Sequence, residues 1–427
     1  MSDWIEWVRE RHQWIRDHGG TRLLAMTSPH DPYWCLMPSR EQQGRWFADI
    51  WNAHGKPGMH LRRMHYAILS GKEPTTLLSG KPYQNTEDSF GWLQAGFTNA
   101  RYLGLVDATH FEEHRSAEAI LNATSRTAPT PRMEISSLLS SSFPTLKPIS
   151  LSRPEPSITG YDYNDADQPF IVELWIEKST MNDILVPLCE ELHINLVECT
   201  GFASITRVVE MVHRAQEKPV RIFYVSDCDH SGKHMPVQVS RQVEFWRHRY
   251  APESDIKLSV LALRPDQVVN YKLPRLFGTG ATELDALEVH YPGLLALMVR
   301  DAMKPYRDAT LKDRLRSAKV DARRQLEAAW DAKTTTERVA FASIQDRVNV
   351  ILERHAAQLS KELEPLRLAV KTVQRRVRRA EKQFTVTLPP RPEPVVPPSE
   401  EEEWLFDSNR DYMEQHEAYS AYKKENQ

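Results

Sequence analysis

The sequence predicts an α/β protein in which a parallel sheet follows a helical N-terminal domain and precedes a helical C-terminal extension. Two observations predict the sheet. Apolar runs at 171–178, 196–199 and 221–225 are short enough to be strands, and segments with helical spacing separate them; strand, helix and strand in this order build parallel sheets. The third observation is a heptad-like repeat of apolar residues from 292 to 383, which predicts long helices.

The predicted sheet belongs to a domain at 161–291. A strand at 171–178 ends near an acid, Glu177. The strand at 221–225 has apolar residues at consecutive positions, as expected of a strand that helices cover on both faces. The other predicted elements are helices at 179–193, 205–216 and 265–271 and strands at 196–199 and 256–263.

Two carboxylates, Asp227 and Asp229, follow the third of these strands directly. Side chains at positions i and i+2 of an extended segment point the same way, so both acids can converge on one point. Carboxylates this close repel each other unless a cation lies between them, and Mg²⁺ prefers carboxylate oxygens. Gly232 permits a tight turn into the next helix. The pattern is also compatible with a helix cap or a loop. Acids at the carboxyl ends of parallel strands face the ligand-binding crevice, so we expect Glu177 to join the pair.

A glutamate after one strand and Asp-x-Asp-x-x-Gly after a later one resembles the Toprim domain, over about residues 168–265. The resemblance implies a Mg²⁺-dependent fold shared by topoisomerases, primases and some nucleases. It also implies that Glu177, Asp227 and Asp229 hold the metal and that Glu177 moves a proton. The two residues between the second acid and the glycine depart from the expected pattern.

A further group of acids lies at 282–288. One of them could join the metal site. Helix starts attract acids through the helix dipole, so we interpret this group as the beginning of a helix.

Residues 1–123 form the predicted N-terminal domain. Its expected helices lie near 4–14, at 40–51, at 60–69 and from about 86 to 104. Thr86 or Asp88 can cap the last helix, and Gly104 can end it. Short helices followed by a polar turn give the outline of a helix-turn-helix or winged-helix DNA-binding domain.

The segment 62–66, followed after a gap by a helix that ends at 100–104, resembles the DNA-binding domain of the topoisomerase VI A subunit. That family, which includes the meiotic double-strand-break transesterase, joins a winged helix to a Toprim domain in this same order. Its motif usually shows Arg, an acid, an apolar residue and two tyrosines; here Arg63 and His65 replace the acid and the first tyrosine. The resemblance assigns the role of nucleophile to Tyr66.

The implied reaction is DNA transesterification. The Tyr66 oxygen attacks a phosphodiester and forms a 5′-phosphotyrosyl link, while Mg²⁺ offsets charge on the transferring phosphoryl group. A tyrosine needs a nearby cation or base to become a nucleophile, and Arg62, Arg63 or His65 could serve. A tyrosine on an amphipathic helix is equally compatible with packing, and arginines there with a solvated face. The predicted DNA-binding residues are Arg62, Arg63, Arg101 and Lys178.

Partners and rival functions also follow from the resemblance. In this family the tyrosine of one subunit meets the metal of the other, so a homodimer is implied. The chain contains no glycine-rich ATP loop, so strand passage would need a separate ATPase subunit. The first alternative is a Toprim nuclease that hydrolyses nucleic acid with metal-activated water and no covalent intermediate, which Met64 and His65 favour. The second is a non-catalytic DNA-binding or assembly protein.

The remaining segments have distinct compositions. Residues 124–160 are rich in Ser, Thr and Pro, which predicts a linker. Residues 292–385 form the predicted coiled-coil extension, which Pro365 breaks or kinks. The arginines at 375–379 either bind DNA phosphates or keep the extension soluble. Residues 386–427 predict a disordered Pro-rich and acidic tail, with a short aromatic terminal helix that docks a partner.

Composition limits the location of the protein. The formal net charge is −3, so any DNA-binding surface must be local. Four cysteines without metal-ligand spacing favour a reducing compartment. We find no apolar stretch long enough to span a bilayer, and Trp4, Glu6 and Trp7 do not fit a signal peptide. We therefore expect a cytoplasmic protein that could associate with the nucleoid.

Overall fold

The computed structural model describes residues 2–18, 23–71, 74–110, 117–135, 150–199, 203–276, 280–354, 359–396 and 403–425. Within these ranges the chain forms thirteen α-helices, a five-stranded mixed sheet and a two-stranded sheet. Contacts between residues divide the chain into two compact units. The first unit comprises Met1–Ser125, Gln168–Arg307 and Val396–Gln427, and the second comprises Arg126–Asp167 and Asp308–Val395.

The first unit contains the five-stranded sheet, with the strand order β4-β3-β5-β6-β7. Its parallel strands are β3 (Ile171–Ile176), β4 (Asn195–Glu198), β5 (Val220–Val225) and β6 (Ile256–Ala262). β7 (Phe406–Asp407) pairs with β6 in the antiparallel direction. Beside it, the Ile256 amide donates to Ser408 Oγ (2.8 Å) across 152 positions of the chain. The parallel strands confirm the α/β class.

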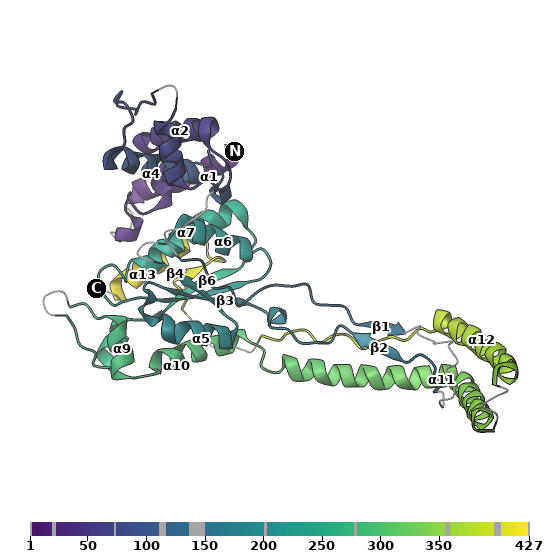
Figure 1. Ribbon diagram of the computed structural model, residues 1–427. Coiled ribbons are helices and arrows are strands. Elements are labelled where there is room, and N and C mark those ends of the chain that lie inside the picture. The colour runs from purple at the N-terminus through teal and green to yellow at the C-terminus, as the bar shows by residue number, and fades with distance from the viewer. Residues whose placement is uncertain are drawn as a thin grey trace. The chain divides into compact units, whose positions relative to one another are not determined.

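Helices cover both faces of this sheet (Figure 1). One face packs against α5 (Asn182–Leu192), α9 (Leu284–His290) and α10 (Leu294–Met303), and the other against α6 (Ile205–Arg214) and α7 (Met235–Tyr250). α8 (Pro265–Asn270) follows β6. Neighbouring strand residues alternate between the two cores: Trp175 and Tyr224 belong to the α6 and α7 side, and Leu174 and Phe223 to the α5 side. Coverage of both faces explains why most positions of β3 and β5 are apolar on both sides of the strand.

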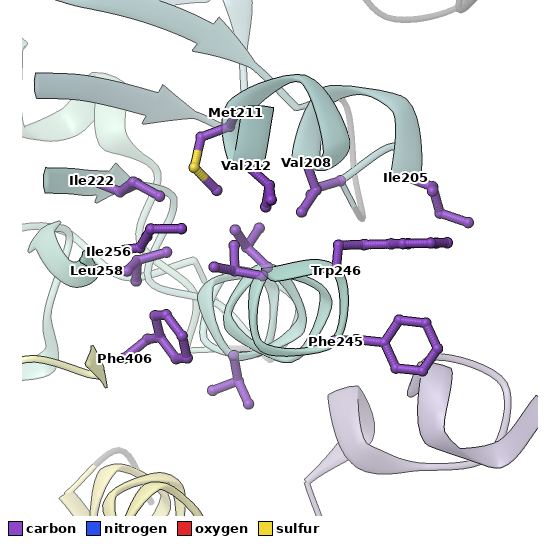
Figure 2. Close-up of a cluster of buried hydrophobic side chains, with 14 of the residues drawn as sticks. Ile205, Val208, Met211, Val212, Ile222, Phe245, Trp246, Ile256, Leu258 and Phe406 are labelled. Carbon is purple, nitrogen blue, oxygen red and sulfur yellow. The ribbon is translucent and has the colours of Figure 1, made fainter. Parts of the chain in front are cut away.

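Figure 2 shows the core between the sheet, α6 and α7. Val208, Met211 and Val212 of α6 lie near strand side chains such as Ile222 and Ile256, and all five are buried. Full burial of one such side chain contributes about 1.5–3 kcal/mol, so this layer is a large part of the driving force for folding of the first unit. The other labelled residues are Ile205, Phe245, Trp246, Leu258 and Phe406.

The N-terminal part of the first unit is helical, as predicted. It contains α1 (Ser2–His18), α2 (Pro38–His54), α3 (Leu61–Leu69) and α4 (Glu87–Tyr102). Thr86 caps α4 by accepting a hydrogen bond from the Ser89 amide (3.2 Å). Gly104 follows the helix with φ +69°, a conformation that favours glycine. Thr76 and Pro82 form an antiparallel bridge between α3 and α4, so the connection between these helices is hairpin-like.

A buried ion pair ties the N-terminal segment to α7. Arg241 of α7 is fully buried, and its guanidinium donates to Asp31 (3.1 Å) and Glu244 (2.8 Å). The guanidinium also lies over the ring of Tyr33, 4.3 Å from its centroid. Burial raises the pKa of Asp31, although Arg241 opposes the shift. Removal of Arg241 would leave the buried Asp31 without a compensating charge, which makes this contact structurally important.

The aromatic residues near the end of the chain pack against the first unit. Trp404, Phe406 and Tyr419 are buried, and Phe406 and Tyr419 belong to the core shared with α6 and α7. α13 (Tyr412–Glu425) carries Tyr419. We predicted a terminal helix that docks a partner; the helix is present, but these rings contact their own chain.

The second unit is built on two long helices. α11 (Leu311–Arg354) and α12 (Leu359–Gln383) pack through a shared cluster of buried apolar residues. β1 (Arg132–Ile135) and β2 (Pro156–Thr159) form its antiparallel pair. The predicted linker therefore contains paired strands, while its serine-rich part at 137–142 lies outside the described residues.

A kink interrupts α11 at Thr334, where φ is −121°. Its hydroxyl donates to the Trp330 carbonyl (2.6 Å) and accepts from Arg153 Nη1 (2.5 Å). Back-bonding of this kind bends helices, and here a buried arginine reinforces it. Pro365, where we predicted the break, lies inside α12.

The Pro-rich part of the predicted disordered tail makes defined contacts within the second unit. Arg391 donates to the Gly160 carbonyl (3.0 Å) and pairs with Asp167 (2.6 Å). The Pro389 carbonyl accepts from the Tyr161 hydroxyl (2.5 Å). The acidic run at 400–402 lies outside the described residues.

None of the helices in the described ranges is both long and apolar enough to cross a membrane. Cys35, Cys189, Cys199 and Cys228 are buried free thiols.

Candidate functional site

The predicted acids meet at the carboxyl ends of two neighbouring strands. β3 and β5 are parallel and pair Ile176 with Val225, so the residues that follow each strand emerge at the same edge of the sheet. Glu177 comes directly after β3, and Asp227 lies two residues after β5. The Asp227 amide donates to Glu177 Oε2 (3.2 Å), which joins the two strand ends. This is the edge at which ligands bind in parallel sheets.

Asp227 is buried, and both of its carboxylate oxygens have partners. Oδ1 accepts from the Leu284 amide (2.8 Å), and Oδ2 forms an ion pair with Lys178 Nζ. Lys178 also pairs with Glu283, so its ammonium group bridges two acids. Burial opposes the charged form of this lysine, but the hydrogen bonds and charges of its partners outweigh burial and raise its pKa. Lys178 therefore neutralises part of the site's negative charge.

Burial and neighbouring negative charges both act on the pKa of Glu177. Its half-buried carboxyl has a raised pKa, first because burial disfavours the ion and then because Asp227 and Asp229 are negative. The Asp227 amide and Lys178 oppose the shift. A carboxyl in this environment holds a proton more readily than an exposed glutamate does.

A tight turn positions Asp229 beside Asp227. The Gly232 amide donates to Asp229 Oδ1 (2.6 Å), and the Gly232 carbonyl accepts from Ser226 Oγ (3.1 Å). A β-carbon at position 232 would lie 2.1 Å from the Asp227 carbonyl oxygen. The turn therefore requires glycine because of this close approach, as the spacing of the motif suggests.

Two acids of the site come from the segment that we interpreted only as a helix start. Cys228 and Thr282 exchange backbone hydrogen bonds (2.9 and 3.1 Å), which brings the beginning of α9 next to the acid loop. Glu283 thereby reaches Lys178, and Asp285 accepts from Thr180 Oγ1 (3.4 Å). The acids at 282–288 were visible in the sequence, but nothing in the sequence indicated the backbone pairing that places them here.

The site offers the kind of atoms that Mg²⁺ prefers, because carboxylate oxygens are hard donors. The described residues nevertheless contain no group of three His, Cys, Asp or Glu side chains arranged to hold a metal ion. Asp227 and Glu283 instead share Lys178. The donor chemistry fits Mg²⁺, and binding would require Lys178 to move away from Asp227.

The sequence matches no protein family model and no curated protein. The chemistry of this site therefore has to be inferred from its own residues.

Tyr66 lies on α3, whose buried residues Met64 and Ile68 belong to a different apolar cluster from those of the sheet. Its side chain is 59% exposed, and its hydroxyl has no hydrogen-bond partner among the described residues. Arg62 and Arg63 are also exposed, four and three residues earlier, so they lie on the same side of the helix. The surface of α3 thus presents a tyrosine with two guanidinium groups nearby.

His65, which could have assisted Tyr66, faces the interior instead. Its Nδ1 contacts the Tyr83 hydroxyl (2.6 Å), and its Nε2 contacts Asn85 Oδ1 (3.0 Å). Both ring nitrogens are occupied and the residue is buried. His65 therefore fixes the hairpin-like connection to α3.

Arg101, a predicted DNA-binding residue, is 6% exposed. Its guanidinium lies 3.8 Å from the Phe97 ring centroid and donates to Thr206 Oγ1 of α6 (3.5 Å). Burial between two helices places Arg101 in a packing contact, where it is inaccessible to DNA phosphates.

β3 itself contains a buried acid, Glu173, that has a structural role. Glu173 is fully buried and accepts hydrogen bonds from Arg214 (2.7 and 3.2 Å), Asn195 (3.1 Å) and Trp175 (2.9 Å). Burial opposes its ionisation, but Arg214 and the other donors outweigh burial and lower its pKa. Glu173 therefore stays charged and supports the strand that ends at Glu177.

Proposed function

We propose that this protein cleaves DNA by Mg²⁺-dependent tyrosine transesterification, with a Toprim-type domain over about residues 168–265 and a winged-helix-type domain before it. The observation that supports the proposal most is the direct contact between Glu177 and the Asp227 amide at the adjoining ends of β3 and β5. Asp229 and Glu283 add negative charge at the same place. Two acids from neighbouring parallel strands give a site for phosphoryl-transfer chemistry.

In this proposal Tyr66 supplies the attacking oxygen. Its proton passes to a solvent water molecule as a bond forms between the tyrosine oxygen and the DNA phosphorus, and the bond from phosphorus to the 3′ oxygen breaks. The products are a 5′-phosphotyrosyl link and a 3′ hydroxyl. Arg62 and Arg63 hold the phosphates on either side of the attacked bond.

We assign to Glu177 the transfer of a proton to the leaving 3′ oxygen, because its half-buried carboxyl lies where the ends of β3 and β5 meet and burial raises its pKa. Lys178 is exposed enough to turn from the acids to a DNA phosphate, since its side chain is 37% accessible. When bound by Glu177, Asp227 and Asp229, Mg²⁺ would offset the negative charge on the phosphoryl group.

The same proposal includes its partners. A homodimer would let Tyr66 of one chain act at the acids of the other. Passage of one DNA duplex through another would need a separate ATPase subunit. The transesterification step itself consumes no ATP, because the phosphotyrosyl link replaces the phosphodiester bond, so cleavage can be assayed with the purified chain.

A hydrolytic Toprim-type nuclease is the second candidate. The position of His65 favours it, because both ring nitrogens are bound to Tyr83 and Asn85 and cannot take the Tyr66 proton. A water molecule would then replace Tyr66 as the nucleophile, and no covalent link to the protein would form.

The test is incubation of the protein with end-labelled duplex DNA and Mg²⁺, followed by denaturant with and without protease. We expect label trapped with protein in the wild type, and none in Tyr66→Phe or Asp227→Ala. Tyr291→Phe is the control, since Tyr291 is another partly exposed tyrosine of the same unit. Free cut ends that need Asp227 but not Tyr66 would establish hydrolysis. Uncut DNA in every sample would indicate a missing partner subunit or a protein that has lost the activity.

A further inference from the structure

Helix α12 of the second unit carries basic side chains along one face. Lys371, Arg375, Arg378 and Lys382 follow each other at intervals of four, three and four residues, and Arg379 lies beside them. All five side chains are exposed. At 1.5 Å per residue the group extends over about 16 Å of helix. We call these five residues the basic stripe.

The opposite face of α12 is fixed. Val370, Val373 and Val377 are buried and pack in one cluster with Ile344 and Val348 of α11. The apolar face is therefore unavailable to a membrane, which an interfacial helix would have to enter with that face. The packing also holds the stripe in a helical conformation, so the cations are ordered before any partner binds.

The charge of the stripe is unbalanced. Six of the twelve residues from 371 to 382 are Lys or Arg and one, Glu381, is acidic, although the whole chain has 55 basic and 58 acidic residues. No stripe residue has an ion-pair partner in the described part of the chain. Exposed arginines of α11 differ: Arg323 pairs with Glu327 (2.7 Å) and Arg324 with Asp321 (3.2 Å). If these side chains served only to keep the helix soluble, basic and acidic residues would be expected to be interspersed on its surface.

We propose that the basic stripe binds the phosphate backbone of duplex DNA. A row of cations about 16 Å long matches a polyanion that carries one negative charge per about 1.7 Å of its axis. Proteins that bind single-stranded nucleic acid normally stack its bases on aromatic side chains, and residues 371–382 contain no aromatic residue. The choice of DNA over duplex RNA rests on the proposed function; the stripe itself does not depend on the acid site.

The stripe makes phosphate contacts without reading base sequence. Binding should therefore be similar for different DNA sequences and should weaken steeply with salt, because each neutralised phosphate releases counterions. Through the stripe, a DNA-cleaving enzyme would stay bound to the duplex independently of the nucleophile and of Mg²⁺.

The test is fluorescence anisotropy of a labelled DNA duplex of about three helical turns, titrated with the full chain in EDTA from about 50 to about 200 mM salt. Arg375→Gln/Arg378→Gln should weaken binding about tenfold. It should also reduce the slope of log affinity against log salt by about two, because two phosphate contacts are lost. Arg375→Lys/Arg378→Lys should retain both properties, which guards against a variant that merely unfolds.

Arg323→Gln/Arg324→Gln is the matched control, since it removes the same charge from exposed but ion-paired arginines of α11. Equal weakening by both double glutamine variants, or an unchanged slope in Arg375→Gln/Arg378→Gln, would overturn the proposal. Tighter binding of a duplex RNA of the same length would overturn the choice of DNA. Binding is measured in EDTA, where no Mg²⁺-dependent cleavage takes place. Failure of the stripe would therefore appear as an unchanged affinity and salt slope, whereas failure of the proposed cleavage site would appear only in the cleavage assay.

Discussion

Replacement of Lys178 with glutamine tests whether the acid site is built for a cation. The change removes the ammonium group that joins Asp227 to Glu283. Breaking a buried ion pair costs about 3–5 kcal/mol, whereas an exposed pair contributes about 0–1 kcal/mol. The Asp227 side chain is only 4% exposed, but those of Lys178 and Glu283 are 37% and 45% exposed. Solvent therefore screens part of the effect, and we expect Lys178→Gln to lower the free energy of unfolding by about 1–2 kcal/mol in EDTA.

Thermal unfolding in EDTA and in Mg²⁺ gives the measurement. The variant should melt below the wild type in EDTA, because Asp227 keeps its charge without its partner. Addition of Mg²⁺ should raise the Tm of the variant more than that of the wild type, because the ion no longer competes with the ammonium group. Mg²⁺ at ten times its Kd would stabilise the folded state by about 1.4 kcal/mol, enough to offset most of the loss.

Lys257→Gln is the control for this experiment. Lys257 pairs with Asp407 (2.9 Å) at the edge of the sheet, in the same unit and with similar chemistry. Its loss should lower the Tm in EDTA and in Mg²⁺ alike. If Mg²⁺ raises the Tm of both variants equally, or of neither, the idea that the Asp227 site accepts a divalent cation is refuted.

Three further substitutions test the reasoning at other places. Gly232→Ala should abolish the Mg²⁺-dependent rise in Tm, since its β-carbon would lie 2.1 Å from the Asp227 carbonyl oxygen; an unchanged rise would contradict the tight turn. Glu173→Leu should lower the free energy of urea unfolding by about 3 kcal/mol because Arg214 loses its buried partner, and a loss below that of Glu173→Gln would contradict this. Asp308 has its pKa lowered to about 2, since hydrogen bonds to the Val395 amide and to its other donors outweigh burial. Its stabilisation is therefore complete above about pH 4 and is lost as the pH falls through 2. Asp308→Asn should be less stable than the wild type by about 2 kcal/mol at pH 6, and urea unfolding should show this difference shrinking towards pH 2; a constant difference would count against it.

The sheet was predictable because its sequence signal is strong. β5 is apolar at almost every position and is buried on both faces, and α6 before it keeps a clear 3.6-residue period. α7, which follows β5, is buried at most positions, so its period is weak and we predicted no bounds for it. Predicted strand ends fall within two residues of the observed ones. The positions of Glu177 and Asp227 follow from strand order alone, because neighbouring parallel strands end at one edge.

Other features depend on contacts that the local sequence does not encode. β7 has two residues, and its partner β6 lies far away in the chain. The contribution of Glu283 depends on the pairing of Cys228 with Thr282, which has no sequence signature. Arginine is a residue type that commonly contacts DNA phosphates, and only the packing of α4 against α6 shows that Arg101 is buried.

The period of the helix would have shown that His65 and Tyr66, both of which we considered for the reaction, lie on different faces of α3. In α3, Met64, His65 and Ile68 are buried and Tyr66 is exposed. His65 lies four residues after Leu61 and three before Ile68, both apolar. It therefore falls on the inner face of the helix, and Tyr66 does not. Assigning His65 to the inner face would have removed it as a helper of Tyr66.

The distance along the chain between β6 and β7 has a consequence for biosynthesis. The hydrogen bond from Ile256 to Ser408 spans 152 positions. At about 5–20 residues per second, a ribosome needs roughly 8–30 s to make that stretch. During this time Lys257 and Leu258 of β6 lack their strand partner, and an open strand edge is a template for aggregation. Nascent chains therefore carry this unpaired edge until residues 406–408 emerge, and termination before these residues would leave it unpaired.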